Sequence, residues 1–227
     1  MNGVAHDPNK HNGKAEGMKL YRFYLFDADG TLMDTAELIY RSYKYTLQKH
    51  NGPDLSRKEI QAGIGIPLRT NIEKYLGPMY DEKYAQIYKE HNGYQFSIAP
   101  DYLSLFPGVE ETLSSLRDQA EGLAVVSSRT APTLLPFFRT LGIAGYFDHF
   151  VTPELTEEHK PHPQPVFKAL ELLGGTPGEA LMVGDTDWDI RSGNSAGVDT
   201  CLVWRDDKPA PPEIRPTFIV NRLTDIM

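Results

Sequence analysis

The sequence predicts an α/β fold in which helices cover a largely parallel sheet, with an all-helical segment inserted after the first strand. Short apolar runs alternate with segments of helical periodicity, as in sheets whose parallel strands are connected by helices. The runs are almost continuously apolar, which is typical of strands buried on both faces. Between residues 34 and 106 such runs are absent, and only helical patterns occur.

The first strand is expected within residues 19–26, "KLYRFYLF", and it stops at an aspartate. Further strands are predicted at the remaining apolar runs, residues 122–127, 149–152, 180–185, 200–204 and 217–220. Apolar spacing predicts helices between them, at residues 108–121, 163–173 and 186–196. The second of these begins at Pro163 and ends before Gly174, which are the positions that proline and glycine favour in helices.

Four helices are predicted in the inserted segment. Apolar residues recur at helical spacing over residues 36–47, and Ser56 with Glu59 has the form of a capping box. Pro67 suits the first turn of a third helix, and residues 80–88 carry the pattern of a fourth. We therefore expect a core domain of residues 18–33 and 107–227, a helical domain of residues 34–106, and a disordered polar tail of residues 1–17.

The composition of the chain argues against nucleic acids and membranes as binding partners. The chain has 227 residues and a formal net charge of −8, and an acidic surface repels the phosphates of nucleic acids. No apolar run approaches the roughly 20 residues that a membrane-spanning helix needs. Cys201 is the one cysteine, so no intramolecular disulfide can form. We expect a cytoplasmic protein without a nucleic-acid or membrane partner.

Chemically useful side chains gather where the predicted strands end. Asp27 and Asp29 follow the first strand, Ser127 ends the second, Lys160 follows the third, and Asp185 ends the fourth. Open α/β sheets bind ligands at this edge, where the carboxyl ends of the strands meet. Several carboxylates in one crevice need a cation, and Mg²⁺ prefers oxygen ligands. A phosphate-binding site typically combines a metal ion, a lysine and hydroxyl groups around the space that the phosphate occupies.

At such a site one aspartate could attack phosphorus in line. The other could protonate the leaving oxygen and later deprotonate water. The turn at Gly30 and Thr31 would offer backbone N–H groups to the phosphoryl oxygens, and Ser128 would add a hydroxyl beside Ser127.

The order of these residues resembles that of the haloacid dehalogenase (HAD) superfamily. "DADGT" at 27–31 matches its first motif, Ser127 stands at the second, Lys160 in "KPHPQP" matches the third, and "GDTDWD" at 184–189 matches the fourth. The resemblance extends from residue 20 to about residue 205 and implies a Rossmann-like, three-layer α/β/α core. The helical insertion is similar to the C1-type cap of phosphoglycolate phosphatases and β-phosphoglucomutases.

The resemblance implies a role for each matching residue. Asp27 would be the nucleophile and a Mg²⁺ ligand, and Asp29 would be the general acid and base and would bind Mg²⁺ through its backbone carbonyl. Ser127 and Lys160 would bind the phosphoryl group. Asp185 would be the remaining protein ligand of Mg²⁺.

Four further residues have a functional role implied by the resemblance and a structural alternative. Asp189 would support the water shell of the metal or orient the lysine; a hydrogen-bonding role in the strand-end loop is the alternative. Gly65 and Arg69 lie in "AGIGIPLRTN" (62–71), which resembles the substrate-specificity loop of C1 caps; a loop with a solvated arginine is the alternative. Arg129 would contact an anionic substrate group or form a surface salt bridge.

Together these residues predict a Mg²⁺-dependent phosphatase that hydrolyses a small organic phosphate monoester through an aspartyl-phosphate, in the manner of phosphoglycolate phosphatases. Asp29 favours phosphoryl transfer to or from oxygen, because haloacid dehalogenases carry tyrosine there. A phosphomutase of the β-phosphoglucomutase type is the alternative, and a HAD fold that only binds its ligand is a third reading. The expected partner is a small phosphorylated metabolite, bound by a monomer or a homodimer.

Overall fold

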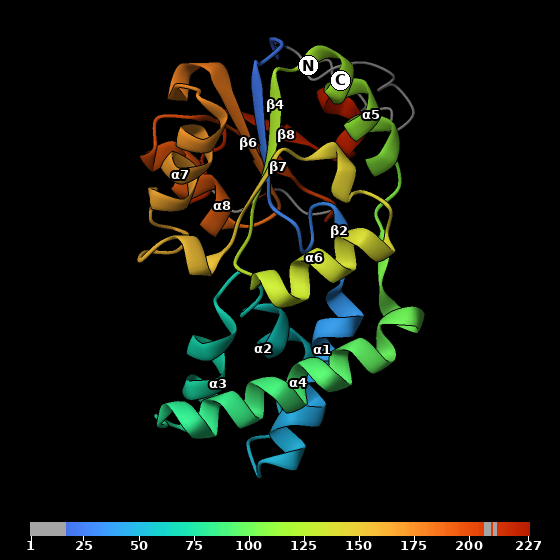
Figure 1. The fold of residues 1–227 in the computed structure, drawn as a ribbon, viewed down its shortest axis with the longest axis vertical. Coiled ribbons are helices and arrows are strands. Elements are labelled where there is room, and N and C mark those ends of the chain that lie inside the picture. The colour runs from blue at the N-terminus through green and yellow to red at the C-terminus, as the bar shows by residue number, and fades with distance from the viewer. Residues whose placement is uncertain (1–16, 207–209, 211–212) are drawn as a thin grey trace, which may run out of the picture.

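The computed structural model describes residues 17–206, residue 210 and residues 213–227 (Figure 1). The predicted disordered tail lies outside the described residues, except for Gly17. None of the helices in the described part of the chain is long and apolar enough to cross a bilayer.

The core domain is built on a six-stranded parallel sheet with the strand order β5-β4-β1-β6-β7-β8. The strands are β1 (Phe23–Phe26), β4 (Gly122–Val126), β5 (His149–Val151), β6 (Ala180–Gly184), β7 (Asp199–Val203) and β8 (Phe218–Val220). Each lies at one of the predicted apolar runs. The first is shorter than predicted, because the exposed Lys19, Leu20 and Arg22 lie before the point where pairing begins.

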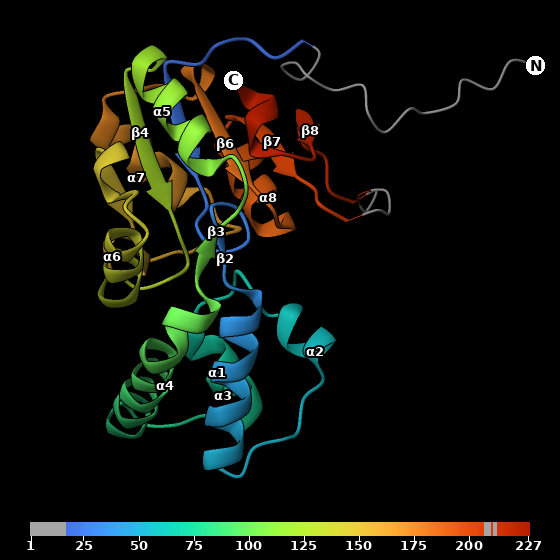
Figure 2. The same ribbon diagram turned by 90° about the vertical axis from the view of Figure 1, so that its right-hand side faces the viewer.

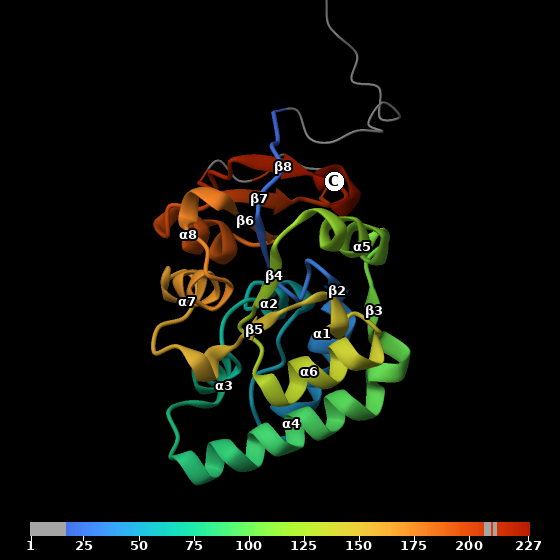
Figure 3. The same cartoon turned by 45° about the horizontal axis from the view of Figure 1, so that its top comes forward.

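Helices cover both faces of this sheet and make three layers (Figures 1 and 3). One face carries α7 (Gln164–Leu173) and α8 (Asp187–Ser195), and the other carries α5 (Val109–Gln119) and α6 (Ala131–Thr140). The helix α6 is not predicted from the sequence. Pro132 fits the first turn of this helix, but Pro136 lies in its interior, where proline is usually unfavourable. Short 3₁₀ turns complete the core at Ala144–Tyr146, Pro153–Leu155, Pro177–Glu179 and Leu223–Ile226.

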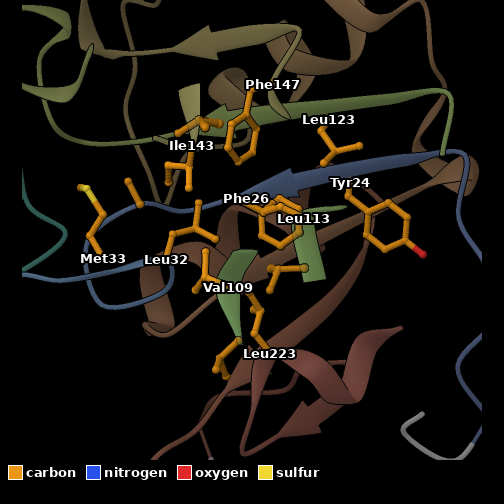
Figure 4. Packing of buried hydrophobic residues seen from close by; sticks show 14 of the residues in the cluster. Tyr24, Phe26, Leu32, Met33, Val109, Leu113, Leu123, Ile143, Phe147 and Leu223 are labelled. Atoms are coloured by element: carbon orange, nitrogen blue, oxygen red, sulfur yellow. The ribbon is translucent and has the colours of Figure 1, made fainter. Parts of the chain in front are cut away.

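The central strand β1 shows how the core is divided. Its side chains alternate between the two faces, so Tyr24 and Phe26 pack with the α5 and α6 side while Phe23 and Leu25 pack with the α7 and α8 side. Figure 4 shows Tyr24 and Phe26 among the apolar side chains of the first group. Burial on both faces holds the end of β1, and therefore Asp27, in a fixed position.

A helical cap, residues 34–106 of the sequence prediction, sits at the carboxyl ends of the strands (Figures 1 and 2). Its helices are α1 (Ala36–Lys49), α2 (Arg57–Gln61), α3 (Leu68–Leu76) and α4 (Asp81–Tyr102). The capping box of Ser56 and Glu59 forms at the start of α2, as predicted. The chain enters the cap through β2 (Met33–Asp34) and leaves it through β3 (Ser104–Leu105), and these two strands pair antiparallel.

Candidate active site

The predicted site residues meet at the carboxyl edge of the sheet, below the cap. Asp27 follows β1, Ser127 follows β4 and Asp185 follows β6, which are the three adjacent central strands. Backbone bonds hold two of these ends in place: the Asp27 N–H donates to Val183 O at 2.9 Å, and the Ser127 N–H donates to Val151 O at 2.9 Å. Lys160 reaches the same point from the loop after β5.

Lys160 is the centre of a buried ionic network. Its Nζ donates to Asp27 Oδ1 and to Asp189 Oδ1, both at 2.6 Å, and to Val126 O at 3.0 Å, so all three N–H groups of the ammonium are used. Burial alone would lower the pKa of Lys160, but Asp189 and Asp27 raise it above its usual range. The lysine is therefore charged at neutral pH. It holds one oxygen of Asp27 and leaves the other uncommitted.

Asp189 is held on both of its oxygens. Lys160 takes Oδ1, while the N–H and hydroxyl of Thr186 donate to Oδ2 at 3.1 and 2.6 Å, closing a capping box at the start of α8. The hydrogen bond from Lys160 to Asp189 supports the predicted role in which Asp189 orients the lysine. Hydrogen bonding within the strand-end loop, the structural alternative, is also present.

The carboxylates of Asp27, Asp185 and Asp189 form a group that could hold a metal ion, with one oxygen of each lying within 4.8 Å of the others. Burial, and then the charge of Asp189, raise the pKa of Asp185 to about 7, and burial raises that of Asp27 well above its usual range. Such crowding of buried carboxylates is relieved by a cation, and an all-oxygen donor set suits Mg²⁺. Because Asp189 already has partners on both oxygens, Asp27 and Asp185 are the side chains available as ligands.

Asp29 has a different environment, although it is only two residues from Asp27. The guanidinium of Arg129 donates to its two oxygens at 2.8 and 2.7 Å, and the Thr35 hydroxyl donates to Oδ1 at 2.7 Å. Burial raises the pKa of Asp29, but Arg129 and Thr35 more than offset it and bring the pKa below its ordinary value. Arg129 is thus in a partly buried ion pair with Asp29, not in the surface salt bridge that was the alternative prediction.

The four predicted phosphate donors Ser127, Ser128, Gly30 and Thr31 differ in whether they already have partners within the protein. Ser128 Oγ is buried without a hydrogen-bond partner, so its hydroxyl is free for a ligand, whereas Ser127 Oγ accepts the Arg129 N–H at 3.0 Å. The Gly30 N–H is committed to Met33 O at 2.9 Å, which corrects the prediction that it faces a phosphoryl oxygen. The tight turn after Asp29 closes on itself by this bond. Thr31 uses its hydroxyl on Asp185, at 3.1 Å.

A cavity lies between this edge and the cap. It is lined by Asp27, Asp29, Ser127, Ser128 and Arg129 of the core, and by apolar and neutral polar residues of the cap: Ile39, Tyr43, Ile64, Gly65, Ile66, Leu68, His91, Asn92 and Gln95. Gly65 therefore lies in the lining of the cavity, and its part in substrate specificity stays a prediction. Arg69 is not among the lining residues, because it forms surface ion pairs with Glu73 at 3.0 Å and Asp81 at 2.8 Å.

Three polar residues of α4 that line the cavity are absent from the predicted site. His91, Asn92 and Gln95 lie at helical spacing and are buried, although polar. A buried polar stripe on a long helix is a signal that the sequence does carry, as "HNGYQ", but it is indistinguishable from a solvated face until the helix is placed.

His91 gives this part of the site a pH dependence of stability. Thr46 Oγ1 donates to Ser42 O at 2.9 Å, so it accepts a hydrogen bond from His91 Nδ1 at 2.9 Å. Burial, and then the charge of Arg129, lower the pKa of His91 to about 3. The unfolded chain binds this proton near pH 6.5, so the native stability is fully present above that pH and is lost as the pH falls towards 3.

We therefore expect the free energy of unfolding to fall by about 2 kcal/mol more in the wild type than in His91→Gln between pH 7 and pH 5. Urea unfolding at several pH values measures it. Glutamine can still donate to Thr46 but does not titrate. Parallel pH profiles of the two proteins would contradict the assignment.

Known proteins that are similar to this chain show its family. The family model of haloacid dehalogenase-like hydrolases matches residues 24–203. The chain is 34% identical to a phosphoglycolate phosphatase of Aquifex aeolicus, over 91% of this chain and 95% of that protein, and 34% identical to a pyrophosphatase PpaX of Bacillus pumilus, over 89% and 93%. Among solved structures, CbbY from Rhodobacter sphaeroides shares the fold, with a TM-score of 0.77 at 20% identity over 90% of this chain and 96% of that one. The chain is therefore an enzyme of the haloacid dehalogenase-like hydrolase family, which includes these phosphatases and pyrophosphatases.

Proposed function

We propose that the protein is a Mg²⁺-dependent phosphatase that hydrolyses a small phosphate monoester through an aspartyl-phosphate on Asp27. The observation that carries this proposal is the separation of two neighbouring aspartates into two environments. Asp27 shares a buried network with Lys160, whereas Asp29 is held by Arg129 and Thr35 at the entrance of the cap. Two carboxylates with different partners can perform two different tasks.

We assign the role of nucleophile to Asp27. Lys160 fixes one of its oxygens, so the other can attack phosphorus while the ammonium offsets the charge that gathers on the phosphoryl group. The free hydroxyl of Ser128 can donate to a phosphoryl oxygen. A bound Mg²⁺, held by Asp27, Asp185 and the backbone carbonyl of Asp29, would neutralise charge on the carboxylates and on the phosphoryl oxygens.

We assign proton transfer to Asp29. Release from Arg129 would remove the strongest influence that lowers the pKa of Asp29, so the carboxylate could take up a proton from solvent, give it to the leaving oxygen and later take one from the water that cleaves the aspartyl-phosphate. The cap covers this chemistry and keeps bulk water out. Phosphoglycolate is the first candidate substrate. Pyrophosphate, an anhydride and not a monoester, is the second, because each is named in relatives at 34% identity that align over most of both chains.

The test is phosphate release from a panel of small phosphorylated metabolites with Mg²⁺, for the wild type and for Asp27→Asn. We expect the isosteric variant to stay folded and to lose at least about a thousandfold in kcat, because an amide cannot form the acyl phosphate. Release that survives in Asp27→Asn would disprove the nucleophile assignment. Isomerisation of a sugar phosphate without net phosphate release would replace the phosphatase by the phosphomutase alternative.

A further inference from the structure

The guanidinium of Arg129 donates three hydrogen bonds in this structure and lies over an aromatic ring. Nε and Nη2 donate to the two oxygens of Asp29 at 2.8 and 2.7 Å, and Nη1 donates to Gln95 Oε1 of helix α4 at 2.6 Å. The group also lies over the ring of Phe137, with Cζ 5.0 Å from the ring centre. Arg129 thereby connects the acid and base of the core to the longest helix of the cap.

This arrangement leaves Asp29 occupied. Its two oxygens accept three hydrogen bonds, two from Arg129 and one from Thr35, and the bidentate pair fixes the plane of the carboxylate. A group that must donate to a leaving oxygen needs an oxygen turned towards the substrate. The guanidinium therefore has to move away from Asp29 before the leaving group can be protonated.

The cavity shows what could draw the guanidinium away. Among the described residues that line it, Arg129 alone carries a permanent positive charge, because Lys160 lies beneath Asp27 and is not part of the lining. The cap side offers aliphatic and neutral polar groups. A second anionic group on the leaving group of the substrate would find no other cationic side chain among the described residues of this lining. The guanidinium could exchange the carboxylate of Asp29 for that anion at little cost in free energy. A neutral leaving group offers no such exchange.

We propose that Arg129 is a specificity-determining and positioning residue that exchanges Asp29 for a second anionic group, a carboxylate or a phosphate, carried by the leaving group of the substrate. This inference rests on the proposed function. It predicts that substrates with a second anion are favoured because their binding also frees Asp29, so Arg129 acts on both KM and kcat for these substrates.

The kinetic test compares matched substrates in the wild type and in Arg129→Gln. 2-Phosphoglycolate is paired with 2-hydroxyethyl phosphate, which replaces the carboxylate by a neutral group, and pyrophosphate is paired with methyl phosphate. We expect the wild type to favour the anionic member of at least one pair by about 30-fold or more in kcat/KM, and Arg129→Gln to abolish that preference. The two pairs report separately on a carboxylate and a phosphate as the second anion.

Controls separate recognition from a merely structural role. Arg129→Lys keeps the charge without the planar fork and should recover part of the preference. Arg117→Gln, which removes an exposed ion pair with Asp148, should leave both ratios unchanged. An equal fall in kcat/KM for the anionic and neutral members in Arg129→Gln would overturn the proposal.

A binding measurement keeps the inference testable without turnover. In the Asp27→Asn background, calorimetry gives the affinities for 2-phosphoglycolate and 2-hydroxyethyl phosphate, with Arg129 present or replaced by glutamine. Loss of the preference for the anionic compound in Arg129→Gln supports the proposal. A preference that is unchanged in Arg129→Gln overturns it. The proposal is also overturned if the protein with Arg129 shows no preference for 2-phosphoglycolate over 2-hydroxyethyl phosphate and none for pyrophosphate over methyl phosphate. Failure of phosphate release from all four compounds would instead count against the proposed function.

Discussion

Lys160→Met is expected to lower the free energy of unfolding by about 3–5 kcal/mol, because it removes one partner of a buried ionic network. Lys160 is 4% exposed and contacts Asp27 and Asp189 at 2.6 Å, and methionine fills similar space without a charge. Both carboxylates would then lack their cation. Phosphate release should also fall at least about a hundredfold, since the phosphoryl group loses its nearest ammonium.

Chemical denaturation in EDTA measures the loss of stability, and repeating it with Mg²⁺ shows how much of the loss a bound cation recovers. Lys168→Met is the matched control, because Lys168 pairs with Glu171 on the surface at 3.0 Å and should cost less than about 0.5 kcal/mol. Equal losses in the two variants would show that the Lys160 network does not stabilise the fold.

Gly30→Ala is expected to disrupt the proposed metal site. Gly30 has φ of +86°, and a Cβ atom there would lie 2.2 Å from Asp185 Oδ2, which is too close for any contact. Either Asp185 or the turn must shift. We expect a loss of about 1–3 kcal/mol in stability, and a weakening of Mg²⁺ binding by at least about tenfold, because the displaced carboxylate is one of the two proposed side-chain ligands.

Gly174→Ala separates the two causes. Gly174 ends α7 with φ of +68°, but no atom lies within 4 Å of the position of an added Cβ. This control therefore carries the backbone strain without the collision, so its stability should fall while Mg²⁺ affinity stays unchanged. Calorimetric titration with Mg²⁺ and thermal unfolding of both variants make the comparison. Unchanged metal affinity in Gly30→Ala would count against Asp185 as a ligand.

The sequence was informative where function depends on the end of a strand. Asp27, Ser127 and Asp185 follow apolar runs, and the rule that parallel strands end at one edge was enough to predict that they meet. The helical cap could also be predicted, because an absence of strand patterns over about seventy residues is a strong local signal.

What could not be predicted depends on side chains that meet across long sequence separations. Arg129 reaches Asp29, 100 residues earlier, and Gln95 on a cap helix. The bond to Asp29 joins two distant segments of the core, and the bond to Gln95 depends on how the cap is docked; no local pattern encodes either contact. The commitment of the Gly30 N–H to Met33 is similar, since a Gly-Thr pair alone does not say whether a turn closes on itself or on a ligand.

The pairing of β2 with β3 has a consequence for how the chain folds. The central strand β1 pairs with β4, and in this register Phe23 lies opposite Gly122, so the loop to be closed is about a hundred residues long. A cap that collapses first brings Met33 beside Leu105 and shortens the effective loop to the roughly 25 residues outside it. Early formation of the cap would then lower the entropic barrier to assembling the sheet, so we expect mutations at the α1–α4 interface to slow refolding of the core.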